Sequence, residues 1–283
     1  MRLATIRTME GTCAARIEAD RVLLLRERDV GALLAAHPGA AGMVEVAALE
    51  PTSELELSQA SFAPLVPHPE KVFCVGMNYR AHIAEMSREL PAYPTLFAKF
   101  ASSLLGPYDD LVLPSVSDSV DWEAELGVII GRPTRRASLA EAAEAIAGFS
   151  VVNDVSMRDW QNRTTQYLQG KAFDRSTPFG PVLVTGDEIG DGVDLEVRCE
   201  LDGVVMQRGR TSDMIFGPAA VVSYISQFAT LVPGDLVSTG TPSGVGAGRD
   251  PQVFLAPGQV LVSSIEGIGS CVNRCVGDID LTS

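Results

Sequence analysis

The chain has 283 residues, of which 46% are hydrophobic, so it can bury a substantial core in one large domain or two modest ones. Its formal net charge of -14 at pH 7 argues against a nucleic-acid-binding protein, because such proteins present basic surfaces. With no apolar run long enough for a membrane span or a signal peptide, and five cysteines without zinc-like spacing, we expect a cytoplasmic protein with reduced thiols and no membrane partner.

Residues 1–66 are predicted to form a small N-terminal domain. Its expected elements are three short strands and one helix, at residues 4–7, 13–18, 21–24 and 30–36. The helix is expected to end at His37-Pro38-Gly39. The proline-rich segment 64–69 is extended and marks the boundary to a second domain at residues 67–283.

The second domain is predicted to be α+β and mostly β, because short strand patterns broken by Gly and Pro outnumber helical patterns. Strands are expected at residues 71–76, 94–105, 126–130, 148–154, 236–239, 259–265 and 270–276. Helices are expected at residues 81–86, 139–147 and 217–229. The second helix follows a capping box, Ser138 to Glu141, and the third has Pro218 in its first turn.

Two glutamates stand at the start of the strand pattern 126–130. If the strand begins a few residues earlier, Glu123 and Glu125 are at i and i+2 and point to the same side. Two adjacent buried carboxylates repel each other, and a hard divalent cation with oxygen ligands would resolve that conflict. The alternative is that both glutamates face water beside a buried strand.

Asp154 ends the apolar strand pattern 148–154 and is a third candidate metal ligand. Arg158 and Gln161 follow at i+4 and i+7, on one face of an expected helix. A carboxylate, a cation and an amide would then converge on one place. The alternative is a helix N-terminal aspartate with an ordinary ion pair to Arg158.

His82 and Glu85 form a candidate general-base pair, because a helix brings the i+3 carboxylate within reach of the imidazole. Such a carboxylate fixes the histidine tautomer and stabilises the imidazolium. The alternative is an incidental pair on a surface helix.

Lys171 lies in the expected loop 169–174, where it either neutralises an anionic substrate or is simply solvated. The glycine-rich stretch 239–248 lacks the Gly-Lys-Ser/Thr ending of a P-loop, so nucleotide binding is not expected. Its expected role is to offer backbone N–H groups and the Thr241 hydroxyl to a carboxylate.

Seven short blocks in this order resemble the fumarylacetoacetate hydrolase family, and together they cover about residues 70–277. They are Gly76-x-Asn78-Tyr79-x-x-His82-x-x-Glu85-Met86, Asp121-x-Glu123-x-Glu125-Leu126, Asn153-Asp154-x-x-x-Arg158-x-x-Gln161, Gly170-Lys171-x-Phe173-Asp174, Asp213-Met214-Ile215-Phe216, Thr239-Gly240-Thr241-Pro242-x-Gly244-Val245-Gly246 and Ile265-Glu266-Gly267-Ile268-Gly269.

The resemblance implies a mixed β-roll or β-sandwich catalytic domain behind the small N-terminal domain, and a homodimer. It also implies one Mg²⁺ or Mn²⁺ per subunit, held by Glu123, Glu125 and Asp154. The catalytic residues that it implies are His82, Glu85 and Lys171. The substrate-binding residues that it implies are Arg158, Gln161, Thr241, Gly240 and Tyr79.

The resemblance further implies a metal-dependent hydrolase that cleaves the C–C bond of a 3-acylpyruvate, such as fumarylpyruvate, through a metal-stabilised enolate and a water activated by His82 and Glu85. An alternative at the same site is oxaloacetate decarboxylation or tautomerisation, or isomerisation of 2-hydroxyhepta-2,4-diene-1,7-dioate. A third possibility is a non-enzymatic metal-binding protein.

Overall fold

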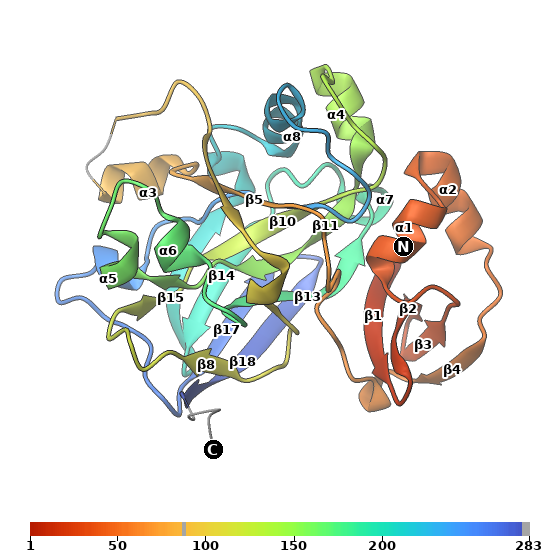
Figure 1. Cartoon of the computed structure of the whole chain (residues 1–283), viewed down its shortest axis with the longest axis horizontal. Coiled ribbons are helices and arrows are strands. Elements are labelled where there is room, and N and C mark those ends of the chain that lie inside the picture. Colours follow the sequence, from red (N-terminus) through yellow and green to blue (C-terminus); the bar gives the residue numbers. More distant parts are fainter. Residues whose placement is uncertain (87–88, 279–283) are drawn as a thin grey trace.

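Two packed β-sheets form the centre of the protein (Figure 1). The computed structural model describes residues 1–86 and 89–278. The larger sheet has 11 strands in the order β4-β3-β2-β1-β13-β11-β10-β16-β5-β6, with β7 beside β13. The smaller sheet has the order β15-β14-β17-β18-β8, and it packs against the central strands β10, β11 and β13. The predicted α+β, mostly β fold class is confirmed.

The strands of the larger sheet are β1 Arg2–Thr8, β2 Gly11–Glu18, β3 Arg21–Leu24, β4 Ser53–Glu56, β5 Val72–Gly76, β6 Thr95–Lys99, β7 Leu104–Leu105, β10 Ala124–Ile130, β11 Ile146–Asn153, β13 Thr177–Val184 and β16 Leu236–Ser238. Those of the smaller sheet are β8 Leu111–Leu113, β14 Glu196–Leu201, β15 Val204–Arg210, β17 Val260–Ile265 and β18 Gly269–Gly277. A separate pair consists of β9 Val120–Asp121 and β12 Ser156–Met157.

Helices cover the edges of this arrangement (Figure 1). The α-helices are α1 Val30–Ala36, α2 Gly39–Ala47, α3 Arg80–Glu85, α4 Leu139–Ala145, α5 Arg158–Gln161, α6 Leu168–Lys171, α7 Gly186–Ile189 and α8 Pro218–Ser226. Short 3-10 turns occur at Leu57–Gln59, Ala101–Ser103, Thr211–Asp213 and Gly246–Gly248.

Strand burial follows from the position of each strand in the two layers. Every residue of β10 is buried, because this strand has neighbours on both edges and is covered on both faces. Strand β18 instead alternates, with Cys271, Asn273 and Cys275 facing the core and their neighbours more exposed. The continuous and alternating apolar patterns of these two strands are therefore consequences of the layer order.

The first strands extend the sheet of the rest of the chain, because β1 pairs with β13 at Arg2↔Val184 and Leu3↔Leu183. Figure 1 shows β1 to β4 together with α1 and α2 at one side of the molecule. The division into domains at residue 66 stays a prediction.

Helix α1 has the predicted bounds, but α2 was not predicted. Its first residue is Gly39 and its N-cap is Pro38, two residue types that we interpreted only as the end of α1. Within the described ranges no single helix is long and apolar enough to cross a membrane. The pair α1 and α2 passes that test on length and composition together, but it is bent by 113°.

Helix α4 begins at the predicted capping box. The Ser138 side chain accepts from the Glu141 N–H, and the Glu141 carboxylate accepts from the Ser138 N–H. These bonds satisfy two backbone donors that a helix start would otherwise leave without partners. Helix α8 likewise begins with Pro218 in its first turn.

Candidate active site

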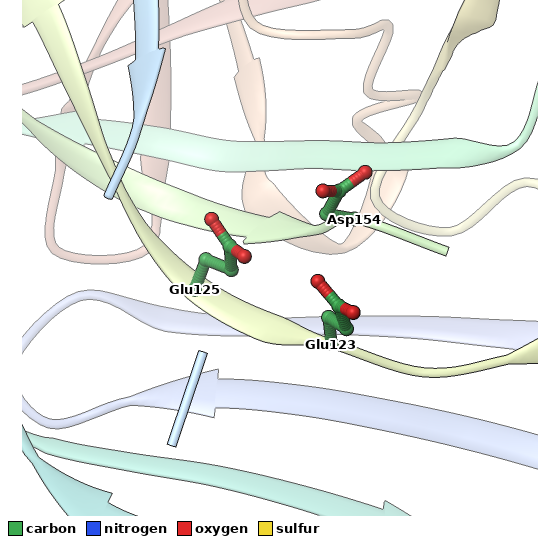
Figure 2. Close-up of side chains that lie close together, drawn as sticks. All are labelled: Glu123, Glu125 and Asp154. Atoms are coloured by element: carbon green, nitrogen blue, oxygen red, sulfur yellow. The ribbon is translucent and has the colours of Figure 1, made fainter. Parts of the chain in front are cut away.

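Three carboxylates meet where the neighbouring strands β10 and β11 reach the same end of the sheet. The antiparallel register pairs Ala124 with Asn153. Glu123 and Glu125 lie on either side of Ala124, and Asp154 follows Asn153. One oxygen from each of the three side chains lies within 4.8 Å of the others. Figure 2 shows these carboxylates turned toward one another. We call Glu123, Glu125 and Asp154 the carboxylate cluster.

Asn153 explains why Glu123 holds this position although it precedes the first residue of β10. The Asn153 side-chain oxygen accepts from the Glu123 N–H at 2.9 Å. Its amide nitrogen donates to Ser263 Oγ of the smaller sheet at 2.7 Å. The Asp154 N–H donates to the Glu123 carbonyl at 2.8 Å, so the two acidic residues are locked together through their backbones.

Two expectations about local structure were wrong. Residues 154–157 do not begin a helix, because Ser156 and Met157 form β12 against β9, and α5 starts only at Arg158. Lys171 lies at the end of helix α6 rather than in a loop. Pairing of β12 with β9, which is distant in sequence, outweighs the local helical spacing that we saw in residues 154–161.

Among the residues that the structure describes, three cations contact the cluster. Lys171 Nζ lies 2.8 Å from Glu123 Oε2 and 2.9 Å from Asp154 Oδ2. Arg158 contacts the second Glu123 oxygen at 2.6 Å. Lys99 Nζ lies 2.7 Å from Asp154 Oδ1. Lys171 is 2% exposed, so its charge is compensated inside the protein rather than by solvent.

These pairs shift the protonation of the groups involved. Burial alone would raise the pKa of Glu123, but Lys171 and Arg158 outweigh it and lower that pKa to about 2. Burial alone would lower the pKa of Lys171, but the carboxylates of Asp154 and Glu123 outweigh it and raise that pKa. Glu123 is therefore ionised and Lys171 protonated at neutral pH.

Glu125 has a different environment. Its Oε2 accepts from Ser238 Oγ at 2.6 Å and from the Gly240 N–H at 2.8 Å, but within the described ranges no cation pairs with it. Burial, followed by the charges of Asp154 and Glu123, raises the pKa of Glu125 well above its ordinary value. An all-oxygen donor set with one uncompensated carboxylate fits a hard divalent cation.

His82 and Glu85 are on helix α3. His82 Nδ1 lies 2.9 Å from Glu85 Oε2. Burial alone would raise the pKa of Glu85, but hydrogen bonds from His82 and from the Gly244 backbone outweigh it and lower that pKa. The ionised carboxylate accepts the Nδ1 hydrogen, which leaves His82 Nε2 as the nitrogen that can take up a proton.

His82 and two members of the cluster, Glu123 and Glu125, line one cavity of about 560 Å³, whereas Asp154 lies behind the lining. His82, Glu123, Glu125 and Lys171 all line it. A proton-transfer group and a candidate metal site thus line the same cavity, whose volume is within the usual range for small-ligand pockets.

The predicted substrate-binding residues separate into two groups. Arg158, Gln161 and Thr241 line the cavity. The Thr241 hydroxyl donates to the Ala124 carbonyl and accepts from Gln207, so it has only a lone pair left to offer. Gly240 does not line the cavity, and its N–H donates to Glu125. Tyr79 is fully buried and also lies outside the lining.

Two residues of the site were missed by the sequence analysis. Lys99 ends β6, and its only signal is a lysine inside the apolar run Leu96 to Phe100. Asp121 opens the Asp-x-Glu-x-Glu block, but we gave it no role. It is fully buried and accepts from Arg158 Nε at 2.8 Å.

Comparison with known proteins decides the family. Residues 71–276 match the family model described as "Fumarylacetoacetate (FAA) hydrolase C-terminal". The chain belongs to the fumarylacetoacetate hydrolase family. An oxaloacetate tautomerase of Homo sapiens, named as mitochondrial, is 45% identical over 224 residues, which cover 78% of this chain and 71% of that protein.

Solved structures share this fold over nearly the whole chain. A protein of Mycobacterium smegmatis is 35% identical, with a TM-score of 0.90 over 99% of this chain and 100% of that chain. A 2-hydroxyhepta-2,4-diene-1,7-dioate isomerase of Mycobacterium marinum is 32% identical, with a TM-score of 0.79 over 98% of this chain and 99% of that chain. The fold that the family resemblance implied is therefore confirmed.

Proposed function

We propose that this protein is a divalent-metal-dependent tautomerase of 2-oxo dicarboxylic acids of the oxaloacetate type. The observation that carries the proposal is the shared cavity, which is lined both by His82, the partner of Glu85, and by Glu123 and Glu125 of the carboxylate cluster. The names of the human relative and of the M. marinum structure, a tautomerase and an isomerase, support this choice over hydrolysis.

The chain's own residues suit keto–enol interconversion. His82 Nε2 would take the proton from C3 of the keto acid, and Glu85 would stabilise the imidazolium through Nδ1. Lys171 lies beside the cluster and is protonated, so it would stabilise the negative charge that develops on the 2-oxo oxygen. A divalent ion held by Glu123, Glu125 and Asp154 would add Lewis-acid polarisation of the substrate oxygens.

The test follows the ultraviolet absorbance of enol-oxaloacetate with Mg²⁺, with Mn²⁺ and with EDTA. We expect metal-dependent interconversion that Glu125→Gln abolishes. The same samples are assayed for carbon dioxide and for cleavage of acetylpyruvate and fumarylpyruvate. If tautomerisation proceeds equally in EDTA, or is no faster than in buffer, the proposal is wrong.

A second candidate is the hydrolysis of a 3-acylpyruvate. It is favoured by the size of the cavity, which is larger than a four-carbon acid needs, and by further polar lining from Asn162, Thr164 and Thr165. Tyr167 also lines the cavity and packs edge-on against Phe97. Hydrolysis requires a positioned water in addition to proton transfer. Faster release of pyruvate from an acylpyruvate than tautomerisation of oxaloacetate would select this candidate.

A homodimer with one metal ion per subunit completes the proposal. It is supported by the family membership alone. Sedimentation equilibrium of the metal-loaded protein should give twice the mass of the chain, and metal analysis should give one ion per chain. The cytoplasmic location likewise stays a prediction, and the human relative's name points to mitochondria for that protein.

A further inference from the structure

Residues 241–248, which we call the glycine loop, lie between the carboxylate cluster and helix α3. On one side the loop contacts β10 and Asp121. On the other side it contacts Glu85. Because the loop contacts both the strand that carries the carboxylate cluster and the helix that carries His82, it can fix the position of one relative to the other.

Glu85 rests on this loop through both hydrogen bonding and close packing. The Gly244 N–H donates to Glu85 Oε1 at 2.9 Å, while Oε2 holds His82 Nδ1. A Cβ added at Gly248 would lie 3.0 Å from the Glu85 carboxyl carbon and 3.2 Å from Oε1. The carboxylate therefore packs so closely over Gly248 that a Cβ there would require it to shift by a few tenths of an ångström.

Asp121 holds the loop from the opposite side. Its Oδ1 accepts from the Gly246 N–H at 2.7 Å, and its Oδ2 accepts from the Ala247 N–H at 3.0 Å. The same Oδ2 accepts from Arg158 Nε at 2.8 Å, and Arg158 in turn contacts Glu123. A fully buried carboxylate with this many donors fixes the loop relative to the cluster.

We propose that the glycine loop is a seat for Glu85, formed by Gly244 and Gly248, and that Asp121 is a positioning residue for this seat. One carboxylate makes both the seat contact and the His82 contact. Contact of α3 with the glycine loop and orientation of the His82 imidazole toward the cavity then depend on the same carboxylate. The inference deepens the proposed function and rests on it for the role of His82.

Gly248→Ala tests the seat without changing any polar group. We expect the amides of residues 80–86 to exchange hydrogen roughly ten- to a hundredfold faster than in the wild type, the range set by one charge-assisted hydrogen bond. Exchange in β10 and β11 should not change. The matched control is Gly186→Ala, because a Cβ at Gly186 meets nothing within 4 Å. Unchanged exchange of α3 in Gly248→Ala would overturn the proposal.

Glu85→Gln separates the two functions of this carboxylate. The amide oxygen can still accept from the Gly244 N–H, but the amide nitrogen cannot accept from His82 Nδ1. We expect exchange of α3 to lie closer to the wild type than in Glu85→Ala, because a weaker hydrogen bond to Gly244 remains, together with a large loss of turnover. If Glu85→Gln and Glu85→Ala speed exchange equally, the His82 contact holds the helix and the seat does not exist.

Asp121→Asn tests the positioning role, because the substituted amide nitrogen cannot accept from Ala247 or Arg158. We expect faster exchange in residues 80–86 and a fall in kcat with little change in KM. Wild-type exchange of α3 in a folded Asp121→Asn protein would refute this role, and Gly248→Ala decides the seat independently should that variant not fold. Exchange needs no substrate, so failure of the seat and failure of the tautomerase proposal are measured separately.

Discussion

At the scale of single residues, the site depends on how buried charges are paired. Four carboxylates and three cations lie around the cluster, and Glu125 is the acid that no cation contacts within the described ranges. Replacing one member of a buried ion pair by a neutral group leaves the other charge buried without a partner. The resulting loss of folding stability is larger than the net stability that the intact pair contributes. The variants below test His82 beside this arrangement and two of its members, Glu125 and Lys99.

His82→Ala should lower the turnover of oxaloacetate by about a hundredfold to ten-thousandfold, the usual contribution of a positioned general base. Affinity for Mn²⁺ should not change, because His82 contributes none of the cluster oxygens. Steady-state kinetics and calorimetric titration with Mn²⁺ measure the two quantities. Wild-type turnover in this variant would remove His82 from the mechanism.

Glu125→Gln should change how stability depends on pH in the metal-free protein. Folding raises the pKa of Glu125 above 4.5, so the folded chain keeps a proton that the unfolded chain releases as the pH rises past that value. The wild type should therefore lose stability relative to Glu125→Gln as the pH rises above about 4.5, and not below it. Urea unfolding in EDTA across this range measures the difference. A difference of the opposite sign would mean that Glu125 is compensated.

Lys99→Met should destabilise the metal-free protein by about 3 kcal/mol, because it leaves Asp154 Oδ1 without its buried partner. Lys171 still contacts Oδ2, which keeps the loss at the lower end of the range for broken buried pairs. The double variant Lys99→Met, Asp154→Asn should recover part of it, since the two residues act together. Urea unfolding of Lys99→Met, Asp154→Asn and the double variant gives the coupling energy, and simple additivity would contradict the pairing.

At the scale of elements, the site is assembled by short segments that approach very closely. Helix α6 carries Lys171, and it lies against α5, which carries Arg158 and Gln161. The approach is possible because Gly170 has no side chain, since a Cβ there would lie 2.4 Å from the Gln161 nitrogen. Backbone contact between two four-residue helices thus sets where the lysine stands.

Gly170→Ala should therefore reduce turnover and destabilise the protein by roughly 1–3 kcal/mol, the usual cost of overpacking. The extra methyl group separates α6 from α5 and moves Lys171 away from Glu123. Thermal unfolding and kinetics measure both effects, with Gly186→Ala as the control. Full activity in Gly170→Ala would show that the position of Lys171 tolerates such a shift.

At the scale of the whole molecule, binding of a metal ion is coupled to folding, because the cluster exists only when β10 and β11 are paired. An ion that binds the folded chain alone stabilises it by about 2.7 kcal/mol at a hundred times its Kd. For a chain of 283 residues the melting temperature should rise by roughly 4–6 °C. Calorimetry with Mg²⁺ or Mn²⁺ measures the rise, and Glu125→Gln should not show it. Equal rises in both proteins would place the ion elsewhere.

Much of the local structure was predictable from neighbouring residues. The capping box at Ser138 identified a helix start, and short strand patterns bounded by Gly identified strands such as residues 270–276, because such signals depend on contacts within a few residues. The ordered sequence blocks identified the family, and with it the fold. The candidate residues Glu123, Glu125, Asp154 and His82 were first named from local spacing, and the blocks that resemble the family contain all four.

The tertiary structure alone decided how these residues meet. The register of β10 on β11 brings Asp154 beside Glu123, and pairing of β9 with β12 replaces the helix that local spacing suggested. Asp121 and Lys99 gained their roles from partners far away in the chain. A sequence encodes periodicity and capping locally, but burial, ion pairing and strand register are set by contacts between distant segments, and these appear only when the chain is folded.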